Sequence, residues 1–217
     1  MLADVQALVG DLVRDTLDQV SPAQRDTAIE LAVARYSADR PRPAVAAAVA
    51  PGGDRLPMPA GWPATAKLAW LEWPLWCNPP AQLAHVPLRT LAGDLVAVTE
   101  IEVPAGDTVH IHYTDMHVLA VAEDSIAIAD REAVAAYAAA LVFDQLASLA
   151  TRNSEPTLNA DAVDHKSQAQ DYAGRARALR KRYTELLAIN DAAAVRPGGA
   201  SVAWPGRTRF PGAGARR

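Results

Sequence analysis

An alanine-rich stretch at residues 129–152, ADREAVAAYAAALVFDQLASLATR, constrains the fold more than any other part of the sequence. Its apolar side chains recur every three or four residues, which is the spacing of one face of an α-helix. That face comprises Val134, Tyr137, Ala138, Leu141, Val142, Gln145, Leu146 and Leu149. Acidic residues in the first turn interact favourably with the positive end of the helix dipole. The stretch predicts a long helix whose small side chains favour close packing against other helices.

Two further helices are predicted at the N-terminus. Residues 2–20 repeat apolar side chains at helical spacing, which predicts a helix of about five turns. The motif SPAQ at residues 21–24 supplies a capping serine, a proline at the first helical position and a glutamine three residues after the cap. The second helix presents Ile29, Leu31, Val33 and Tyr36. The prolines of DRPRP, residues 39–43, end it, so residues 1–43 predict an antiparallel helical hairpin.

Residues 44–124 have a different pattern. Short apolar runs such as AVAAAVA and LVAVTEIEV alternate with the turn motifs PGGD, PAGW, LAGD and PAGD. This pattern is typical of short strands joined by tight turns. We expect a small β-rich domain of about four to six strands, with one or two helical turns near residues 64–70.

Four of the five tryptophans lie close together in this domain: Trp62, Trp70, Trp73 and Trp76. Indole rings bury a large area and seek one polar partner. A cluster in the core or in a subunit interface is therefore the favoured interpretation, and an aromatic ligand cage is the alternative.

Residues 125–190 are expected to complete an antiparallel helical bundle. A last helix is predicted from about residue 161 to residue 190, and its apolar face comprises Tyr172, Ala173, Ala176, Leu179, Tyr183, Leu186 and Leu187. The following segment, residues 191–217, is rich in Gly, Pro and Arg and cannot bury a core of its own. The predicted fold class is α+β: an antiparallel helical bundle with an inserted small β-rich domain and an extended C-terminal arm.

The formal charge of −4 conceals a strong asymmetry along the chain. Residues 1–164 carry 10 Lys and Arg against 22 Asp and Glu, whereas residues 165–217 carry 11 against 3. Such asymmetry indicates a nucleic-acid-binding arm, or a subunit whose basic end meets an acidic surface on a partner or on another copy. The last helix carries five cations: Arg175, Arg177, Arg180, Lys181 and Arg182. They could bind phosphates, but cations also suit the C-terminal end of a helix, so a solvated or protein-contact role is favoured.

The sequence also favours a protein that is neither secreted nor membrane-spanning. Cys77 is the only cysteine, which excludes an internal disulfide. Neither a basic and apolar leader nor an uninterrupted apolar run of about 18 residues occurs. We therefore expect a protein made in a reducing cytoplasm.

The segment TVHIHYTDMH, residues 108–117, raises the question of a metal site because it holds three of the five histidines. A strand has a side-chain period of two, so the segment predicts an apolar face and a polar face. The apolar face is Val109, Ile111 and Tyr113, and the polar face is Thr108, His110 and His112.

Two histidines at this spacing can chelate zinc, and Asp115 and His117 lie nearby in the sequence. The spacing H-x-H-x-x-D-x-H turns Asp115 to the opposite face, however, and no later His or Cys cluster completes a site. A strand surface that faces solvent or an interface is therefore favoured over a zinc hydrolase built on His110, His112 and His117.

Other catalytic motifs are not found. The sequence has no phosphate-binding loop, no G-x-S-x-G elbow and no C-x-x-C motif. Cys77 has no charged neighbour in the sequence to stabilise a thiolate. His165 follows Asp164 near the start of the last helix, where a solvated or capping pair is favoured over catalysis. We expect neither enzymatic activity nor a cofactor.

Six segments of the chain, taken in order, resemble the pattern of a known protein family. They are ARYSADRPRP after the two N-terminal helices, LPMPAGW, LEWPLWCNPP, VPAGDTVHIHYTDMHVL, DREAVAAYAAALVFDQLA and ADAVDHKSQAQDYAGRARALRKRY. In order and spacing they resemble the head–tail connector (adaptor) proteins of tailed bacteriophages and prophages, over about residues 8–187. His117 falls where that pattern often has histidine, whereas His110 and His112 fall at positions that vary.

The resemblance implies a structural virion protein of the neck, at the head–tail interface, that is assembled in the host bacterial cytoplasm. Twelve identical subunits would form a ring beneath the portal protein, extend the DNA channel and contact a downstream neck or tail protein. DNA would pass through without sequence-specific binding, and no membrane would be involved. The alternative reading is a DNA-binding or DNA-packaging accessory protein that uses the basic last helix and the arm.

In related connectors the C-terminal segment reaches onto the portal. The resemblance therefore implies portal-docking or oligomer contacts in the last helix and the arm. These residues are Tyr172, Arg175, Arg177, Arg180, Lys181, Arg182, Tyr183, Trp204, Arg207, Arg209 and Phe210.

Overall fold

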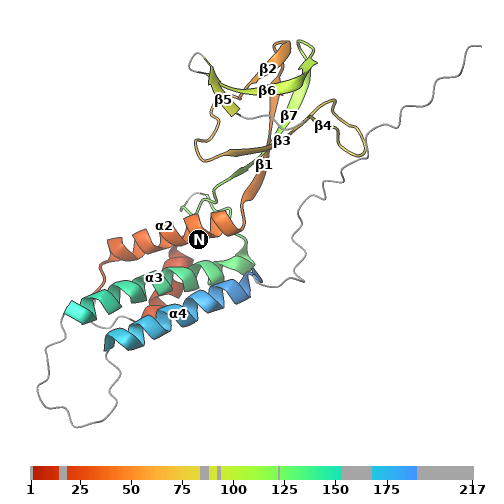
Figure 1. The fold of residues 1–217 in the computed structure, drawn as a ribbon. Coiled ribbons are helices and arrows are strands. Elements are labelled where there is room, and N and C mark those ends of the chain that lie inside the picture. The colour runs from red at the N-terminus through yellow and green to blue at the C-terminus, as the bar shows by residue number, and fades with distance from the viewer. Residues whose placement is uncertain are drawn as a thin grey trace, which may run out of the picture.

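The computed structural model describes residues 2–14, 19–83, 88–91, 94–121, 123–152 and 168–189. Within these residues the chain forms a helical part and a β part, which Figure 1 shows at opposite ends. The fold is α+β, as the sequence predicts. The helices are α1 (Leu2–Val13), α2 (Pro22–Asp39), α3 (Arg131–Arg152) and α4 (Gln168–Leu186), and the 3₁₀ turn η1 (Ile128–Asp130) leads into α3.

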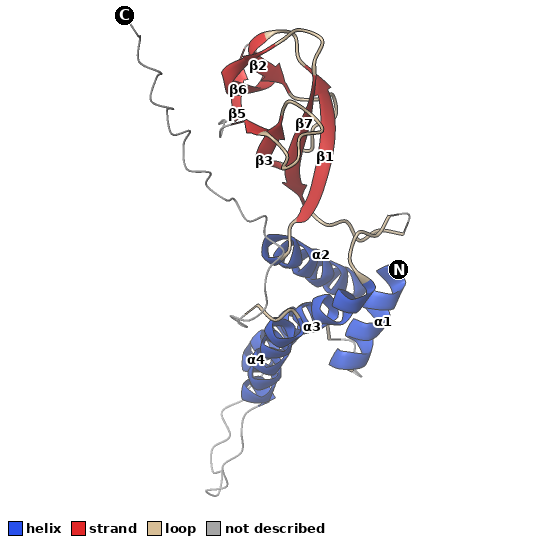
Figure 2. Ribbon diagram, turned by 90° about the vertical axis from the view of Figure 1, so that its right-hand side faces the viewer, coloured by secondary structure: helices blue, strands red, loops and turns tan. Residues whose placement is uncertain are grey.

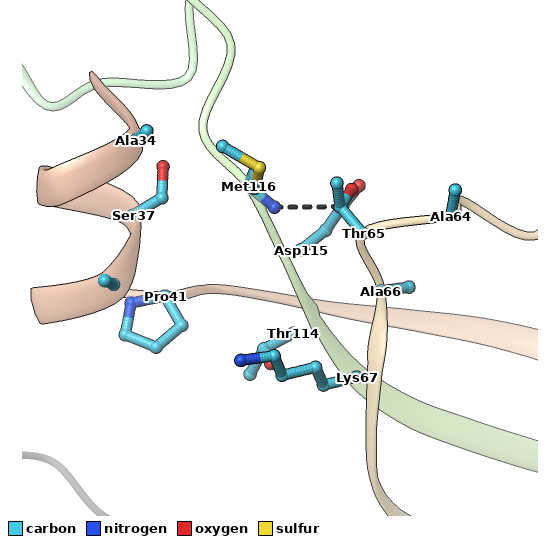
Figure 3. Close-up of a pocket in the computed structure, with 11 residues that line it drawn as sticks. Ala34, Ser37, Pro41, Ala64, Thr65, Ala66, Lys67, Thr114, Asp115 and Met116 are labelled. Atoms are coloured by element: carbon cyan, nitrogen blue, oxygen red, sulfur yellow. Dashed lines mark hydrogen bonds between the residues drawn. The ribbon is translucent and has the colours of Figure 1, made fainter. Parts of the chain in front are cut away.

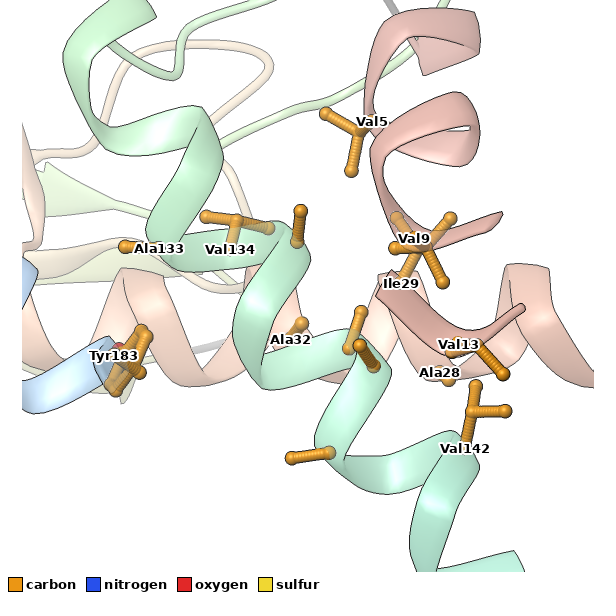
Figure 4. Packing of buried hydrophobic residues seen from close by; sticks show 14 of the residues in the cluster. Val5, Val9, Val13, Ala28, Ile29, Ala32, Ala133, Val134, Val142 and Tyr183 are labelled. Carbon is orange, nitrogen blue, oxygen red and sulfur yellow. The ribbon is translucent and has the colours of Figure 1, made fainter. Parts of the chain in front are cut away.

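Helix α3 lies at the centre of the helical part, because α1, α2 and α4 all pack against it (Figure 2). Its buried residues therefore extend over most of the helix circumference. Six of its alanines are fully buried: Ala133, Ala135, Ala136, Ala138, Ala139 and Ala140. Figure 4 shows the valines of α1 and the small side chains of α2 converging on this helix. Small side chains let the helix axes approach closely, so alanine contributes here by its size as much as by its helix propensity.

The two N-terminal helices differ in how well the sequence predicts them. Helix α2 has the expected capping box, in which the Gln24 backbone N–H donates to Ser21 Oγ and the Ser21 backbone N–H donates to Gln24 Oε1. The helix ends at the predicted prolines. Helix α1 is shorter than the predicted five turns, because it ends at Val13 and Arg14 adopts a positive φ of 47°. Of the apolar residues expected on α2, Ile29 and Tyr36 are buried, whereas Leu31 is 55% exposed.

The β part contains seven strands in the described residues, one more than the upper end of the predicted range. They are β1 (Arg42–Val49), β2 (Gly53–Pro57), β3 (Lys67–Glu72), β4 (Gln82–Leu83), β5 (Leu88–Leu91), β6 (Asp94–Val103) and β7 (Thr108–Asp115). They form two antiparallel sheets: sheet A in the order β1-β7-β3-β4, and sheet B in the order β2-β6-β5. The strand predicted in the segment 108–117 is confirmed as β7, which ends at Asp115.

A second hydrophobic core lies in the β part and draws residues from both sheets. Sheet A contributes Leu71, Val109 and Ile111, and sheet B contributes Leu56 and Ala97. Because strand side chains alternate between faces, the other face of sheet A points away from this core.

The prediction of helical turns near residues 64–70 is wrong, because β3 begins at Lys67. The register between β3 and β7 shifts between Leu68 and Trp70. The shift lets Leu68 pack against the core, while Trp70, two residues later, lies on the other face against His112. A local irregularity of this kind leaves no period in the sequence, so pattern analysis missed the strand.

One helical stretch of the described chain, Ile128–Thr151, is long and apolar enough to cross a membrane by length and composition. The search for an uninterrupted apolar run missed it, because polar residues interrupt the stretch. Of its most apolar window, 56% is buried inside the protein. Core helices of soluble proteins have the same property, and the central position of α3 accounts for the composition.

Candidate interaction surfaces

A partly buried polar network lies where the chain passes from the helical part into the β part. The Tyr36 hydroxyl donates to Asp130 Oδ2 at 2.7 Å, and Arg40 Nη1 donates to the same oxygen at 2.8 Å. Arg40 Nη2 also donates to the carbonyl of Leu187 at 3.0 Å, beyond the end of α4. Asp130 and Arg40 together therefore tie α2, η1 and the end of α4 to one another, just before the chain enters β1.

His117 also belongs to this network, which we call the joint between the helical part and the β part. Its ring Nε2 lies 2.9 Å from the Arg40 carbonyl, its Nδ1 lies 3.0 Å from the Ser125 carbonyl, and its backbone N–H donates to Ser37 Oγ at 2.9 Å. The ring packs on Tyr36 with a centroid distance of 4.8 Å. Both ring nitrogens are engaged within the chain, so His117 acts as a structural histidine.

Ionisation of Tyr36 gives the joint a testable pH dependence. Burial is the main reason that the pKa of Tyr36 is raised from 10.0 to about 12. The hydrogen bond to Asp130 and the negative charge of that carboxylate also raise it. Burial and Asp39 also raise the pKa of Tyr183. The neutral phenols therefore stabilise the fold fully below pH 10, and that contribution is lost as the pH rises through the folded-state pKa values.

We expect Tyr36→Phe to lower the free energy of unfolding at pH 7 by about 1–2 kcal/mol, because it removes a buried hydrogen bond to a carboxylate. The same variant should lose less stability than the wild type between pH 10 and pH 12. Urea unfolding across that range measures both effects. Parallel pH profiles for the two proteins would contradict the assignment.

A shallow cavity of about 440 Å³ lies beside the joint, between α2 and the beginnings of β1 and β3 (Figure 3). Its charged side chains are Lys67 and Asp115. Asp115 accepts hydrogen bonds from Thr65 Oγ1 at 2.6 Å and from the Met116 backbone N–H at 2.8 Å. Its carboxylate therefore fixes a turn.

The outward side of sheet A carries a cluster of aromatic and ionisable side chains. His112 stacks on Trp70 with a centroid distance of 3.6 Å and an interplanar angle of 7°. Glu72 Oε2 lies 3.1 Å from His112 Nε2 and 3.5 Å from His110 Nδ1. Trp76, which is 88% exposed, contacts the His110 ring edge-on at 6.2 Å. We call this surface, together with the exposed valines of β1, the outer face of sheet A: Val45, Val49, Trp70, Glu72, Trp76, His110 and His112.

The four tryptophans are therefore not one cluster. Trp62 and Trp73 pack against the β core, and Trp73 Nε1 donates to Asp107 at 3.1 Å. Trp70 and Trp76 lie on the outer face of sheet A. Spacing along the chain cannot separate the two pairs, and for Trp70 it is the register shift in β3 that decides which side of the sheet the ring occupies.

The sequence analysis missed Glu72, Val45 and Val49 as surface residues. A signal for the valines was present, because the alternation in AVAAAVA places both on one face of a strand. Glu72 joins the histidines only through the pairing of β3 with β7, which one sequence does not reveal.

The zinc hypothesis built on His110, His112 and His117 is wrong in its ligand set. His110 and His112 share Glu72, whereas His117 is bonded to Arg40 and Ser125. Among the residues that the structure describes, no group of three or more His, Cys, Asp and Glu is arranged to hold a metal ion.

The cations of α4 are partly neutralised by α3. Arg180 pairs with Asp144 and Arg182 pairs with Glu132, while Arg175 lies over the Phe143 ring at 5.8 Å. Lys181 lies 3.5 Å from Glu185 on its own helix, and both side chains are exposed. The exposed side of α4 is therefore less positive than its sequence suggests.

Tyr183 and Tyr172, two aromatic residues expected to make portal or oligomer contacts, differ in their burial. Tyr183 is 1% exposed and donates to Asp39 at 2.7 Å, so it stabilises the helical part and cannot present a docking surface without unpacking. Tyr172 is half-buried, and its hydroxyl accepts from Gln168 Nε2 at 2.9 Å. The other expected contacts, Trp204, Arg207, Arg209 and Phe210, lie outside the described residues, as does His165.

Comparison with protein-family models, with curated proteins and with solved structures finds no match to this chain. Its function is therefore inferred from its residues and their arrangement.

Proposed function

We propose that this chain is a head–tail connector (adaptor) subunit of a tailed bacteriophage or prophage, a structural protein of the virion neck. Twelve copies would form a ring beneath the portal, extend the DNA channel and contact the next neck or tail protein. The observation that carries the proposal, beside the sequence resemblance, is the division of the chain into two parts with different surfaces. A closed ring needs two different, complementary surfaces on each subunit.

The charges of the two parts support such contacts. The β part, residues 42–116, has four Lys and Arg against seven Asp and Glu, and Glu100 and Glu102 are exposed on β6. Helix α4 and residues 190–217 together carry ten Lys and Arg against three Asp and Glu. In the proposed assembly the helices form the antiparallel bundle, and its basic end faces the portal.

Deletion of residues 195–217 tests the portal-docking role. We expect the truncated protein to keep its fold, because the described core lies within residues 2–189, and to lose its association with portal rings. A full-length control with Trp204→Ala and Phe210→Ala isolates the two aromatic anchors from the arginines. Normal joining of the truncated protein to portal-bearing heads would show that the arm is not the docking element.

The alternative, a DNA-binding accessory protein, makes a different quantitative prediction. If all five cations of α4 and the five arginines of residues 190–217 contacted phosphates, the logarithm of the binding constant would fall with that of the salt concentration with a slope of about −9. The pairing of Arg180 and Arg182 with α3 argues against a full set of contacts. We expect a shallower slope in a duplex-binding series from 50 to 200 mM salt, and a slope of the full size would favour the alternative.

A further inference from the structure

The edge of β1 has the features of a docking site for an extended segment. β1 is the terminal strand of sheet A, and all eight of its residues are in register with β7 on one side. In the described part of the chain no strand pairs with its other side. The backbone N–H and C=O groups on that side are therefore available to an added strand.

This edge lacks the usual protection of exposed strands. Edge strands are normally shielded by charged side chains, prolines or bulges. β1 has Arg42 and Pro43 at its start, but residues 44–49 are AVAAAV, without a charge. Val45 is 55% exposed and Val49 is 63% exposed. On the same face Val45 lies opposite His112, whose ring stacks on Trp70. An apolar surface next to an open edge indicates a partner.

The C-terminal arm starts next to this edge. Arg40 Nη2 donates to the Leu187 carbonyl at 3.0 Å, and β1 begins two residues after Arg40. Figure 1 shows the end of α4 below the start of β1. The last described residue, Ile189, is therefore close to the first residue of the open edge.

The arm is long enough to follow β1 to its far end. Eight strand residues span about 26 Å, whereas the 28 residues from 190 to 217 can span roughly 90 Å when extended. About ten residues can therefore be used to reach the strand, and more than enough remain to pair with it.

The composition of the arm matches the surface. Residues 200–204 read ASVAW, a short β-prone segment with Val202 and Trp204 on one side of an extended chain. Residues 190–217 carry five Arg against one Asp, while the β part carries an excess of three acidic residues, including Glu72 on the outer face of sheet A. The arm therefore matches the edge of β1 in its alternating apolar side chains, and its positive charge is opposite to the charge of the β part.

We propose that the part of the arm around residues 200–204 of the same chain adds as a strand to the open edge of β1 and covers the exposed valines of the outer face of sheet A in the free subunit. Val202 and Trp204 pack near Val45 and Val49. The docking itself does not rest on the proposed function. If the arm also binds the portal in the connector, it must first leave β1. The edge of β1 would therefore stay covered until assembly.

Hydrogen exchange of the β1 amides tests the docking in the isolated protein, without a portal. The chain is compared with a full-length variant carrying Val202→Asp and Trp204→Asp, and with a charge-matched control carrying Ala213→Asp and Ala215→Asp. Alternate β1 amides point away from β7, and in the wild type and the control we expect them to exchange at least tenfold more slowly than in the Val202/Trp204 variant. The β7 amides should exchange alike in all three proteins.

Equal exchange of the outward β1 amides in all three proteins would overturn the proposal. Protection that increases with protein concentration would also overturn it, because the added strand would then come from a second copy. Because no portal is present, failure of this experiment leaves the connector proposal intact, and failure to bind a portal leaves the docking intact.

Discussion

Replacing Asp130 by alanine is expected to lower the free energy of unfolding by about 3 kcal/mol. The carboxylate accepts from the Tyr36 hydroxyl at 2.7 Å and from Arg40 at 2.8 Å. Tyr36 is only 2% exposed, so its hydroxyl would be left buried without a partner, and that penalty adds to the lost hydrogen bonds. The Arg40 side chain is 44% exposed and can turn towards solvent, which limits the total.

Urea unfolding measures the effect, and Asp130→Asn is the matched control. The amide oxygen of asparagine can still accept from Tyr36, so we expect it to cost roughly half as much as alanine. In the double variant with Tyr36→Phe, the loss should be smaller than the sum of the two single losses, because both act on one hydrogen bond. Additive losses would show that Asp130 and Tyr36 act independently.

Replacing Ile111 by alanine is expected to destabilise the protein by about 2–5 kcal/mol. Ile111 is fully buried in the β core, and alanine would leave a cavity between the two sheets. The neighbouring His112 lies on the opposite side of β7. His112→Ala should cost about 1 kcal/mol or less, because it loses one stacking contact and one half-exposed hydrogen bond.

The comparison decides which face of β7 stabilises the fold. Both variants are measured by urea unfolding with near-ultraviolet circular dichroism, which reports on the tryptophans of the β part. A loss for His112→Ala as large as that for Ile111→Ala would mean that the polar face has a structural role that the geometry does not explain.

The elements that the sequence predicts well are those whose signals are local. The capping box of α2 and its proline stop need only the residues from Ser21 to Pro43, and the strand at β7 follows from alternation over eight residues. The end of α1 at Val13 could not be predicted, because the apolar spacing continues beyond it. The exposure of Leu31 likewise depends on which sides of α2 other elements cover.

The candidate surfaces depend on pairings between distant residues, which one sequence does not contain. Glu72 meets His110 and His112 only because β3 pairs with β7. Arg180 and Arg182 form a cationic row in the sequence, but their acidic partners lie on α3. Tyr183 has the spacing of an apolar face and was assigned to a contact surface, whereas its burial against α2 and α3 places it in the core.

Mixing the purified protein with rings of its cognate portal protein tests the connector proposal most directly. Light scattering gives the mass of the complex, and electron microscopy gives its symmetry. We expect a ring of twelve chains added to the narrow end of the portal. The proposal would be contradicted if the protein stayed unbound at saturating concentration while it bound duplex DNA with a steep dependence on salt.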